Sequence, residues 1–130
     1  MDNELQRVML VEEDPDIRTV ASLALETVGG FTLCACESGA QALQSVTGFS
    51  PQLILLDVMM PDMDGPGVLA ALRARPECAS IPVIFLTAKA QTSEIEKLLS
   101  LGAIQVIGKP FDPMTLADSV RAAWRALPGS

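Results

Sequence analysis

Side chains that could do chemistry follow four of the apolar runs in this chain. They are two acids after the first run, a third acid after another, and a hydroxyl and an amine after two more, namely Glu12, Glu13, Asp57, Thr87 and Lys109. Carboxylates bind hard cations such as Mg²⁺, whereas a hydroxyl and an ammonium can donate hydrogen bonds to phosphoryl oxygens. As a set, these residues could hold a metal ion and a phosphoryl group.

Asp57 is the member of this set that is hardest to explain as a solvated loop residue. It follows the wholly apolar residues 53–56 and precedes Val58, Met59 and Met60. A carboxylate in such surroundings is partly buried and needs a compensating positive charge, which Lys109 or a bound cation could supply. Each of the other polar residues, taken alone, is more typical of an exposed loop.

Five short apolar runs, which we predict to be strands, alternate with five segments of helical periodicity. The runs cover residues 8–11, 32–36, 53–56, 83–86 and 104–107. Short links between them imply an α/β fold of parallel strands joined by right-handed crossovers, with helices on both faces of one doubly wound sheet. Ligands of such sheets bind beyond the carboxyl ends of the strands, where the polar residues lie.

Local signals predict where several helices start. Asp14 should cap the first helix, with Pro15 in its first turn. Ser93 and Glu96 have the spacing of a capping box for the fourth helix. These signals predict that the helices begin just after the strand ends that carry the polar residues.

The fifth helix is expected to start at Asp112 and Pro113. Its charged residues should face water or a partner, and they are Asp118, Arg121 and Arg125. A face of this kind permits two copies to pair into a homodimer but does not require it.

Length and composition favour one domain over residues 1–130, with a core of about residues 5–127. The net charge of -7 argues against direct binding to nucleic acid or anionic lipid, because neutralising phosphates needs clustered Lys and Arg. No stretch could span a bilayer, so we expect a cytoplasmic protein. Three cysteines without any histidine favour reduced, structural thiols.

Three motifs resemble the receiver domains of two-component response regulators. They are the segment from Leu56 through Asp57 to Gly65, the sequence Leu86-Thr87-Ala88, and the sequence Gly108-Lys109-Pro110-Phe111. The resemblance covers essentially the whole chain, and the order and spacing of the three motifs make coincidence improbable. It implies five strands in the order 2-1-3-4-5.

The resemblance also implies a role for each residue. Asp57 would be the phosphoacceptor, attacking the phosphorus of a phosphohistidine, while Thr87 and Lys109 would stabilise the phosphoryl oxygens. A Mg²⁺ ion would be held by Glu12, Glu13, Asp57 and the backbone carbonyl of Met59. By analogy, the Lys109–Pro110 bond would be cis.

The partners implied by the family are a sensor histidine kinase or phosphotransfer protein and an output protein or fused effector domain. Such a protein is no enzyme beyond its own phosphorylation and dephosphorylation.

Four positions depart from the family's pattern or border its water path. Glu13 stands where most receivers have Asp, and the extra methylene alters the reach of the carboxylate toward octahedral Mg²⁺. Val106 replaces an aromatic residue that swings inward, so we expect the signal to leave through the Thr87 loop and the fourth helix. Met59 and Lys89 border the path of the hydrolytic water, and we predict that Met59 prolongs the phosphorylated state.

Two other functions stay open. An aspartate-nucleophile phosphatase of the haloacid dehalogenase type would use similar residues, but it needs a second Asp where this chain has Met59. A receiver-like adaptor that binds its partner without phosphate would keep the fold and drop the chemistry, and Glu13 and Val106 suggest this alternative.

Overall fold

The computed structural model describes residues 4–129, which form one five-stranded parallel sheet in the order β2-β1-β3-β4-β5. The strands are β1 (Arg7–Val11), β2 (Thr32–Cys36), β3 (Leu53–Asp57), β4 (Val83–Thr87) and β5 (Gln105–Gly108). The helices are α1 (Pro15–Leu23), α2 (Gly39–Phe49), α3 (Gly65–Arg73), α4 (Thr92–Ser100) and α5 (Leu116–Arg125). This architecture confirms the predicted fold and strand order.

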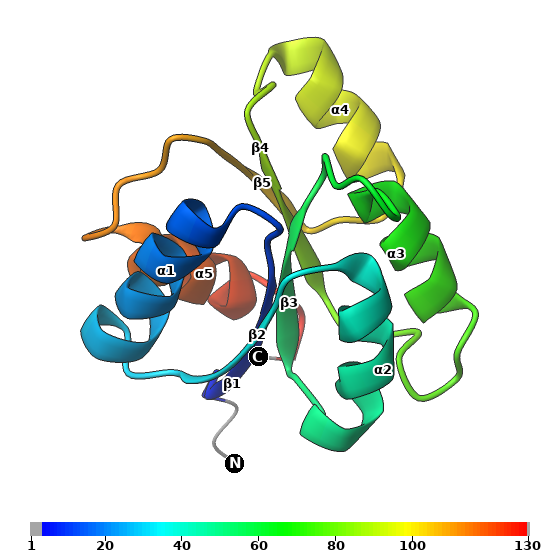
Figure 1. Ribbon diagram of the computed structural model, residues 1–130, viewed down its shortest axis with the longest axis horizontal. Coiled ribbons are helices and arrows are strands. Elements are labelled where there is room, and N and C mark those ends of the chain that lie inside the picture. Colours follow the sequence, from blue (N-terminus) through cyan, green and yellow to red (C-terminus); the bar gives the residue numbers. More distant parts are fainter. Residues whose placement is uncertain (1–3, 130) are drawn as a thin grey trace.

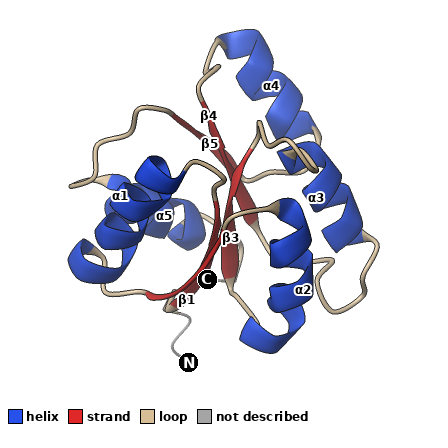
Figure 2. Ribbon diagram, viewed as in Figure 1, coloured by secondary structure: helices blue, strands red, loops and turns tan. Residues whose placement is uncertain are grey.

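Helices cover both faces of the sheet, as Figures 1 and 2 show. α1 and α5 pack on one face, and α2, α3 and α4 pack on the other, each face enclosing its own apolar cluster. Every residue of β3 and β4 is buried, because these central strands are covered from both sides. The two layers therefore hold the carboxyl ends of the central strands in fixed positions.

α1 begins as predicted. Asp14 Oδ1 accepts hydrogen bonds from the backbone amides of Asp16 and Ile17 at 2.8 and 3.1 Å, and Pro15 opens the helix. The helix then widens into a π-helical turn, η1 (Ala24–Val28), which the helical periodicity of the sequence did not indicate. The cap fixes the direction in which the chain leaves β1.

The predicted starts of α4 and α5 are wrong. α4 begins at Thr92 after Gln91, which makes no side-chain capping bond, so Ser93 lies inside the helix and caps nothing. α5 begins at Leu116, because Asp112 first closes a turn in which its Oδ1 accepts from the Met114 amide at 2.8 Å. A capping residue there stabilises a turn in place of a helix start.

Arg121 also departs from its predicted exposure on α5. Its guanidinium donates to the backbone carbonyl of Gly29 and stacks over the Phe31 ring at 4.3 Å from the ring centre. Asp118 and Arg125 are exposed as expected. Arg121 therefore ties α5 to the end of the first helical segment and is not a free charge for a partner.

Three further findings concern the sequence expectations. The first and fifth strands start one residue away from their predicted positions, at Arg7 and Gln105. Cys34, Cys36 and Cys78 are free thiols. Across residues 4–129, no helix has the length and apolar character needed to cross a membrane.

Candidate functional site

The sheet brings two of the predicted acids together at its carboxyl edge. β1 and β3 are neighbours, and their register pairs Val11 with Leu56, so Glu12 and Asp57 leave adjacent strands at the same level. Both side chains are buried, with 0% of Glu12 and 2% of Asp57 exposed. Two carboxylates removed from water in this way need positive charge nearby.

Lys109 supplies positive charge to both acids. Its Nζ lies 2.8 Å from Glu12 Oε1 and 3.0 Å from Asp57 Oδ1. The lysine follows β5, and its backbone amide donates to the carbonyl of Thr87 at 2.8 Å, which anchors it to the end of β4. The Lys109–Pro110 bond is cis, as the resemblance implies. We call Glu12, Asp57 and Lys109 the charge cluster.

Burial and pairing oppose each other in the charge cluster. Burial raises the pKa of Glu12, the Lys109 hydrogen bond lowers it, and the neighbouring Asp57 raises it again, with a net increase. Burial lowers the pKa of Lys109, but hydrogen bonds to the two carboxylates outweigh that effect and raise it. Because two carboxylates share one ammonium, the cluster can accept a further cation.

Thr87 lies at the end of β4, next to the charge cluster in the sheet order. It is 2% exposed, and its register partner on β5 is Gly108, the residue before Lys109. Its Oγ1 accepts a hydrogen bond from the Lys89 amide at 3.0 Å. The hydroxyl hydrogen can therefore be donated to an incoming phosphoryl oxygen.

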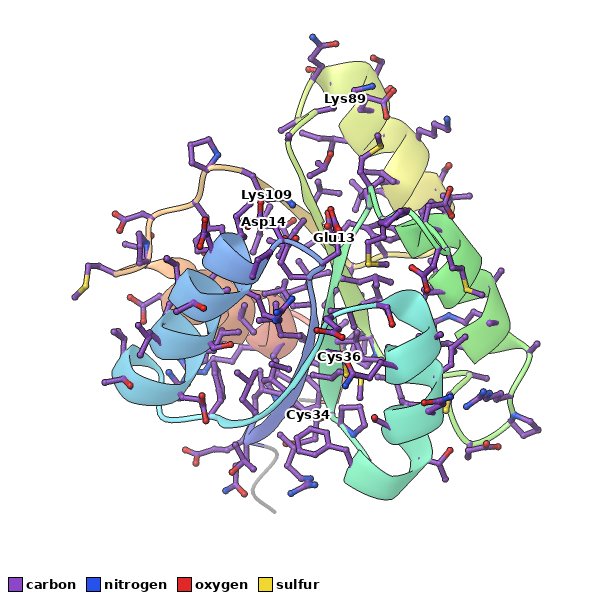
Figure 3. All side chains as sticks on the ribbon, in the orientation of Figure 1. Glu13, Asp14, Cys34, Cys36, Lys89 and Lys109 are labelled. Carbon is purple, nitrogen blue, oxygen red and sulfur yellow. The ribbon has the colours of Figure 1, made fainter. Side chains whose placement is uncertain are left out.

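The structure does not draw Glu13 into the charge cluster. Its side chain is exposed, and among residues 4–129 no three acidic or cysteine side chains stand close enough together to hold a metal ion. The expected ligand set of Glu12, Glu13 and Asp57 is therefore not assembled by the protein alone. Figure 3 shows Glu13, Asp14 and Lys109 at one end of the sheet, while Cys34 and Cys36 lie farther along β2.

Of the remaining predicted residues, only Met59 contacts the charge cluster directly in the described part of the chain. Met59 donates its backbone amide to Asp57 Oδ1 at 3.3 Å, while its side chain is 63% exposed. Lys89 is exposed beside the start of α4. Val106 is half-buried and packs against the apolar cluster under α2, α3 and α4. Two carboxylates, the Met59 carbonyl and water would still fit Mg²⁺, which retains several waters in proteins.

Two residues contribute to this site although the sequence analysis assigns them no role in it. Arg18 on α1 donates its Nη1 to the backbone carbonyls of Glu12 and Glu13 at 2.9 and 3.3 Å. Gly65 opens α3 so close to β3 that an added Cβ would lie 2.6 Å from the carbonyl oxygen of Asp57. Gly65 is the last residue of the motif that contains Asp57, and this position in the motif is the signal that could have marked it. No local sequence pattern marks Arg18.

An apolar hollow of about 480 Å³ borders the charge cluster. It is lined by Ile17 and Val20 of α1, by Ala88 after β4, and by Lys109 and Phe111 after β5. Val20 is 42% exposed, so α1 presents an apolar side chain to solvent here. The hollow therefore presents an apolar surface next to the acids.

The family model and the related sequences point to the same protein family. The sequence model of the response regulator receiver domain family matches residues 8–121. The DNA-binding response regulator MtrA of Mycolicibacterium smegmatis is 37% identical over 125 residues, which cover 96% of this chain and 53% of MtrA. The transcriptional regulatory protein CseB of Streptomyces coelicolor is 39% identical over 91% of this chain and 49% of its own length.

Solved structures agree with the sequence relatives. The chemotaxis protein CheY4 of Vibrio cholerae matches with a TM-score of 0.84 at 25% identity, over 92% of this chain and 98% of that one. A response regulator from Desulfuromonas acetoxidans matches with a TM-score of 0.83 at 30% identity, over 94% and 98%. The chain thus spans about half the length of the curated relatives it matches and nearly all of these structures.

Proposed function

This chain belongs to the response regulator receiver family, and from that premise we propose that Asp57 accepts a phosphoryl group from a phosphohistidine. The observation that carries the proposal is the buried Asp57 carboxylate at the end of β3, with the Lys109 ammonium 3.0 Å from its Oδ1. We treat residues 1–130 as one receiver unit with its core in residues 5–127, acting in the cytoplasm.

The transfer step follows from the groups around Asp57. Oδ1 accepts the hydrogen bonds of Lys109 and Met59, so we assign attack on phosphorus to Oδ2. The new oxygen–phosphorus bond forms as the phosphorus–nitrogen bond breaks, and the electron pair leaves with the imidazole. The product is an acyl phosphate, and its hydrolysis by water returns the carboxylate and inorganic phosphate.

Lys109 and Thr87 would stabilise the transferred group. The Lys109 ammonium is shared by two carboxylates before transfer and can turn to a phosphoryl oxygen once Asp57 is esterified. The Thr87 hydroxyl donates to a second oxygen, which changes its hydrogen bond with the Lys89 amide. Movement of Thr87 is thereby passed to residues 88–91 and to α4.

A Mg²⁺ ion would be held by Glu12, Asp57 and the carbonyl of Met59, with Glu13 reaching it through water. When bound, Mg²⁺ offsets negative charge on the carboxylates and the phosphoryl oxygens. Because Mg²⁺ binds the ionised carboxylate, the burial that raises the pKa of Glu12 also opposes metal binding as the pH falls. The protein's share is to hold two buried carboxylates in place and to exclude bulk water from them.

The partners follow from the same proposal. The histidine kinase or phosphotransfer protein would bind over the apolar hollow beside Lys109, where Ile17 and Phe111 are available to it. The output would be a partner protein or a further domain, as the DNA-binding relatives suggest. Pairing of two copies through α4 and α5 would use exposed residues such as Asp118 and Leu99. The chain itself would catalyse only its own phosphorylation and dephosphorylation.

The experiment is to incubate the protein with acetyl phosphate and Mg²⁺ and to measure the intact mass. We expect a gain of one phosphoryl group that needs Mg²⁺ and disappears in Asp57→Asn. A wild-type protein that gains no mass but still binds its partner would overturn the proposal in favour of the phosphate-independent adaptor. Turnover of a generic aryl phosphate would favour the phosphatase alternative instead.

A further inference from the structure

Arg18 connects the loop after β1 to the rest of the sheet edge. Its Nη1 donates to the carbonyls of Glu12 and Glu13, and its Nη2 lies 3.8 Å from the Glu37 carboxylate beyond β2. The Arg18 side chain is 23% exposed, and its contacts join the loop after β1 to the loop after β2. The charge cluster uses none of these contacts directly.

The two carbonyls that Arg18 binds lie where the regular ladder of the sheet stops. The last bond between β1 and β2 runs from the Glu12 amide to the Cys36 carbonyl at 3.0 Å. Beyond it, the chain turns toward α1 and its carbonyls leave the sheet. Charged donors make stronger hydrogen bonds than neutral ones, so Nη1 restrains the Glu12 carbonyl at 2.9 Å and, more weakly, the Glu13 carbonyl at 3.3 Å.

The orientation of these peptide planes decides where the acids point. The Glu12 amide is held by β2 and its carbonyl by Arg18, while its carboxylate accepts from Lys109 and from the Asp14 amide at 3.1 Å, so backbone and side chain are restrained together. The Glu13 carbonyl accepts from the same Arg18 nitrogen at 3.3 Å, so the backbone from which the exposed Glu13 carboxylate extends is restrained as well. A shift of either plane would move both carboxylates.

We infer that Arg18 is a positioning residue that sets the Mg²⁺ affinity of the site formed by Glu12, Asp57 and the Met59 carbonyl, through its bonds to the backbone carbonyls of Glu12 and Glu13. The inference rests on the proposed function, because Mg²⁺ binding is part of that proposal. Arg18 touches neither the metal nor the phosphoryl group. Residues that orient metal ligands commonly change metal affinity by about 10- to 100-fold when they are removed.

The test is a titration of the whole chain with Mg²⁺, in which NMR signals of the backbone amides of residues 12–14 report binding. We expect Arg18→Ala to weaken the apparent Mg²⁺ affinity about tenfold. Arg18→Lys, which keeps one charged donor, should recover part of that loss. Arg18→Gln provides a neutral donor and a second folded variant if the alanine form does not fold.

Arg75→Ala is the matched control. Arg75 is half-buried and donates its Nη1 to a backbone carbonyl, that of Leu43, at 2.7 Å, but it lies after α3 and outside the site. Its loss should leave Mg²⁺ affinity unchanged. If the Arg18 variants bind Mg²⁺ within twofold of wild type, or weaken it no more than Arg75→Ala does, the inference is wrong.

The inference and the proposed function can fail separately. If Asp57 gains a phosphoryl group in the wild type while the Arg18 variants keep their Mg²⁺ affinity, the positioning role alone is lost. If the Arg18 variants weaken Mg²⁺ binding but Asp57 is never phosphorylated, the positioning role stands and the function is wrong. A wild type without any saturable Mg²⁺ response would contradict the inference as well.

Discussion

The loop after β1 and the loop after β4 are built in different ways, although both border Asp57. In residues 12–14, Glu12 binds Lys109, Asp14 caps α1, and two carbonyls are held by Arg18. Residues 88–91 are all exposed, and the single side-chain bond of that loop runs from the Lys89 amide to Thr87. We call residues 12–14 the held loop and residues 88–91 the free loop.

The difference between the two loops indicates a division of labour. Chemistry on phosphorus requires carboxylates and an ammonium in fixed positions, which the held loop and the charge cluster provide. A signal requires a segment that changes at low cost, and the free loop leads into α4 without a side-chain cap. Substitutions in the two loops and in the charge cluster between them should therefore have unequal effects.

The largest effect is expected for Lys109→Met. Removing the ammonium leaves Glu12 and Asp57 buried without their positive partner, which should lower the free energy of unfolding by about 3 kcal/mol and abolish phosphorylation. Lys89→Met on the free loop should change stability by less than about 0.5 kcal/mol. Equal losses in the two variants, measured by urea unfolding, would remove the distinction between the loops.

The next effect concerns Gly65, which packs α3 against β3. In Gly65→Ala the new Cβ would lie 2.6 Å from the Asp57 carbonyl oxygen, so strand or helix must shift, at a cost of about 2 kcal/mol. Gly48→Ala in α2 is the control, since nothing lies within 4 Å of its added Cβ. That helical substitution should stabilise by about 0.5 kcal/mol. Urea unfolding of both variants checks the contrast.

A smaller loss is expected in Thr87→Val, which keeps the shape and removes the hydroxyl. The Lys89 amide then loses its acceptor, which should cost about 1 kcal/mol and speed hydrogen exchange at that amide. Thr87→Ser keeps the oxygen and should retain the protection. Exchange at residues 12–14 should not change in either variant, and a change there would show that the two loops are coupled.

The smallest effect is expected from capping α4. Gln91→Asp places a good capping residue before Thr92 and should raise the free energy of unfolding by about 0.5 kcal/mol. Asp14→Ala removes the cap of α1 on the held loop and should lower the free energy of unfolding by about 1 kcal/mol. If capping α4 has no effect on stability or on exchange in residues 88–91, the free loop is already held by other contacts.

The pH dependence of stability isolates Glu12 within the charge cluster. Because burial raises the pKa of Glu12 above its ordinary value of 4.5, the folded protein holds this proton more tightly than the unfolded chain does. The stabilisation of the folded state by this proton is fully present below pH 4.5 and is lost as the pH rises through the raised pKa of Glu12. Glu12→Gln should flatten that part of the stability curve, and parallel curves for the two proteins would contradict the assignment.

Much of the fold could be predicted because its signals are local. The buried run before Asp57 marks β3, and Asp14 with Pro15 marks α1. The start of α4 could not be found in this way, because the Ser93 and Glu96 spacing fits a capping box that the chain does not use. Local spacing shows which caps are available and leaves open which backbone turn competes with them.

The site was predicted to the extent that it follows from strand ends. Parallel register brings the residues after β1 and β3 together, which explains why Glu12 and Asp57 meet. The outward direction of Glu13 and the reach of Arg18 depend on how the loop turns after the sheet ends. Contacts of that kind depend on three-dimensional packing, and no periodic pattern of residues in the sequence predicts them.

The most direct test of the account is the position of the phosphoryl group itself. After reaction with acetyl phosphate and Mg²⁺, borohydride reduction converts an aspartyl phosphate into homoserine, which tandem mass spectrometry of peptides can locate. The account predicts homoserine at position 57 and at no other acidic residue. Modification at Glu12, Asp62 or Asp64 in its place, or no modification of a folded protein, would contradict it.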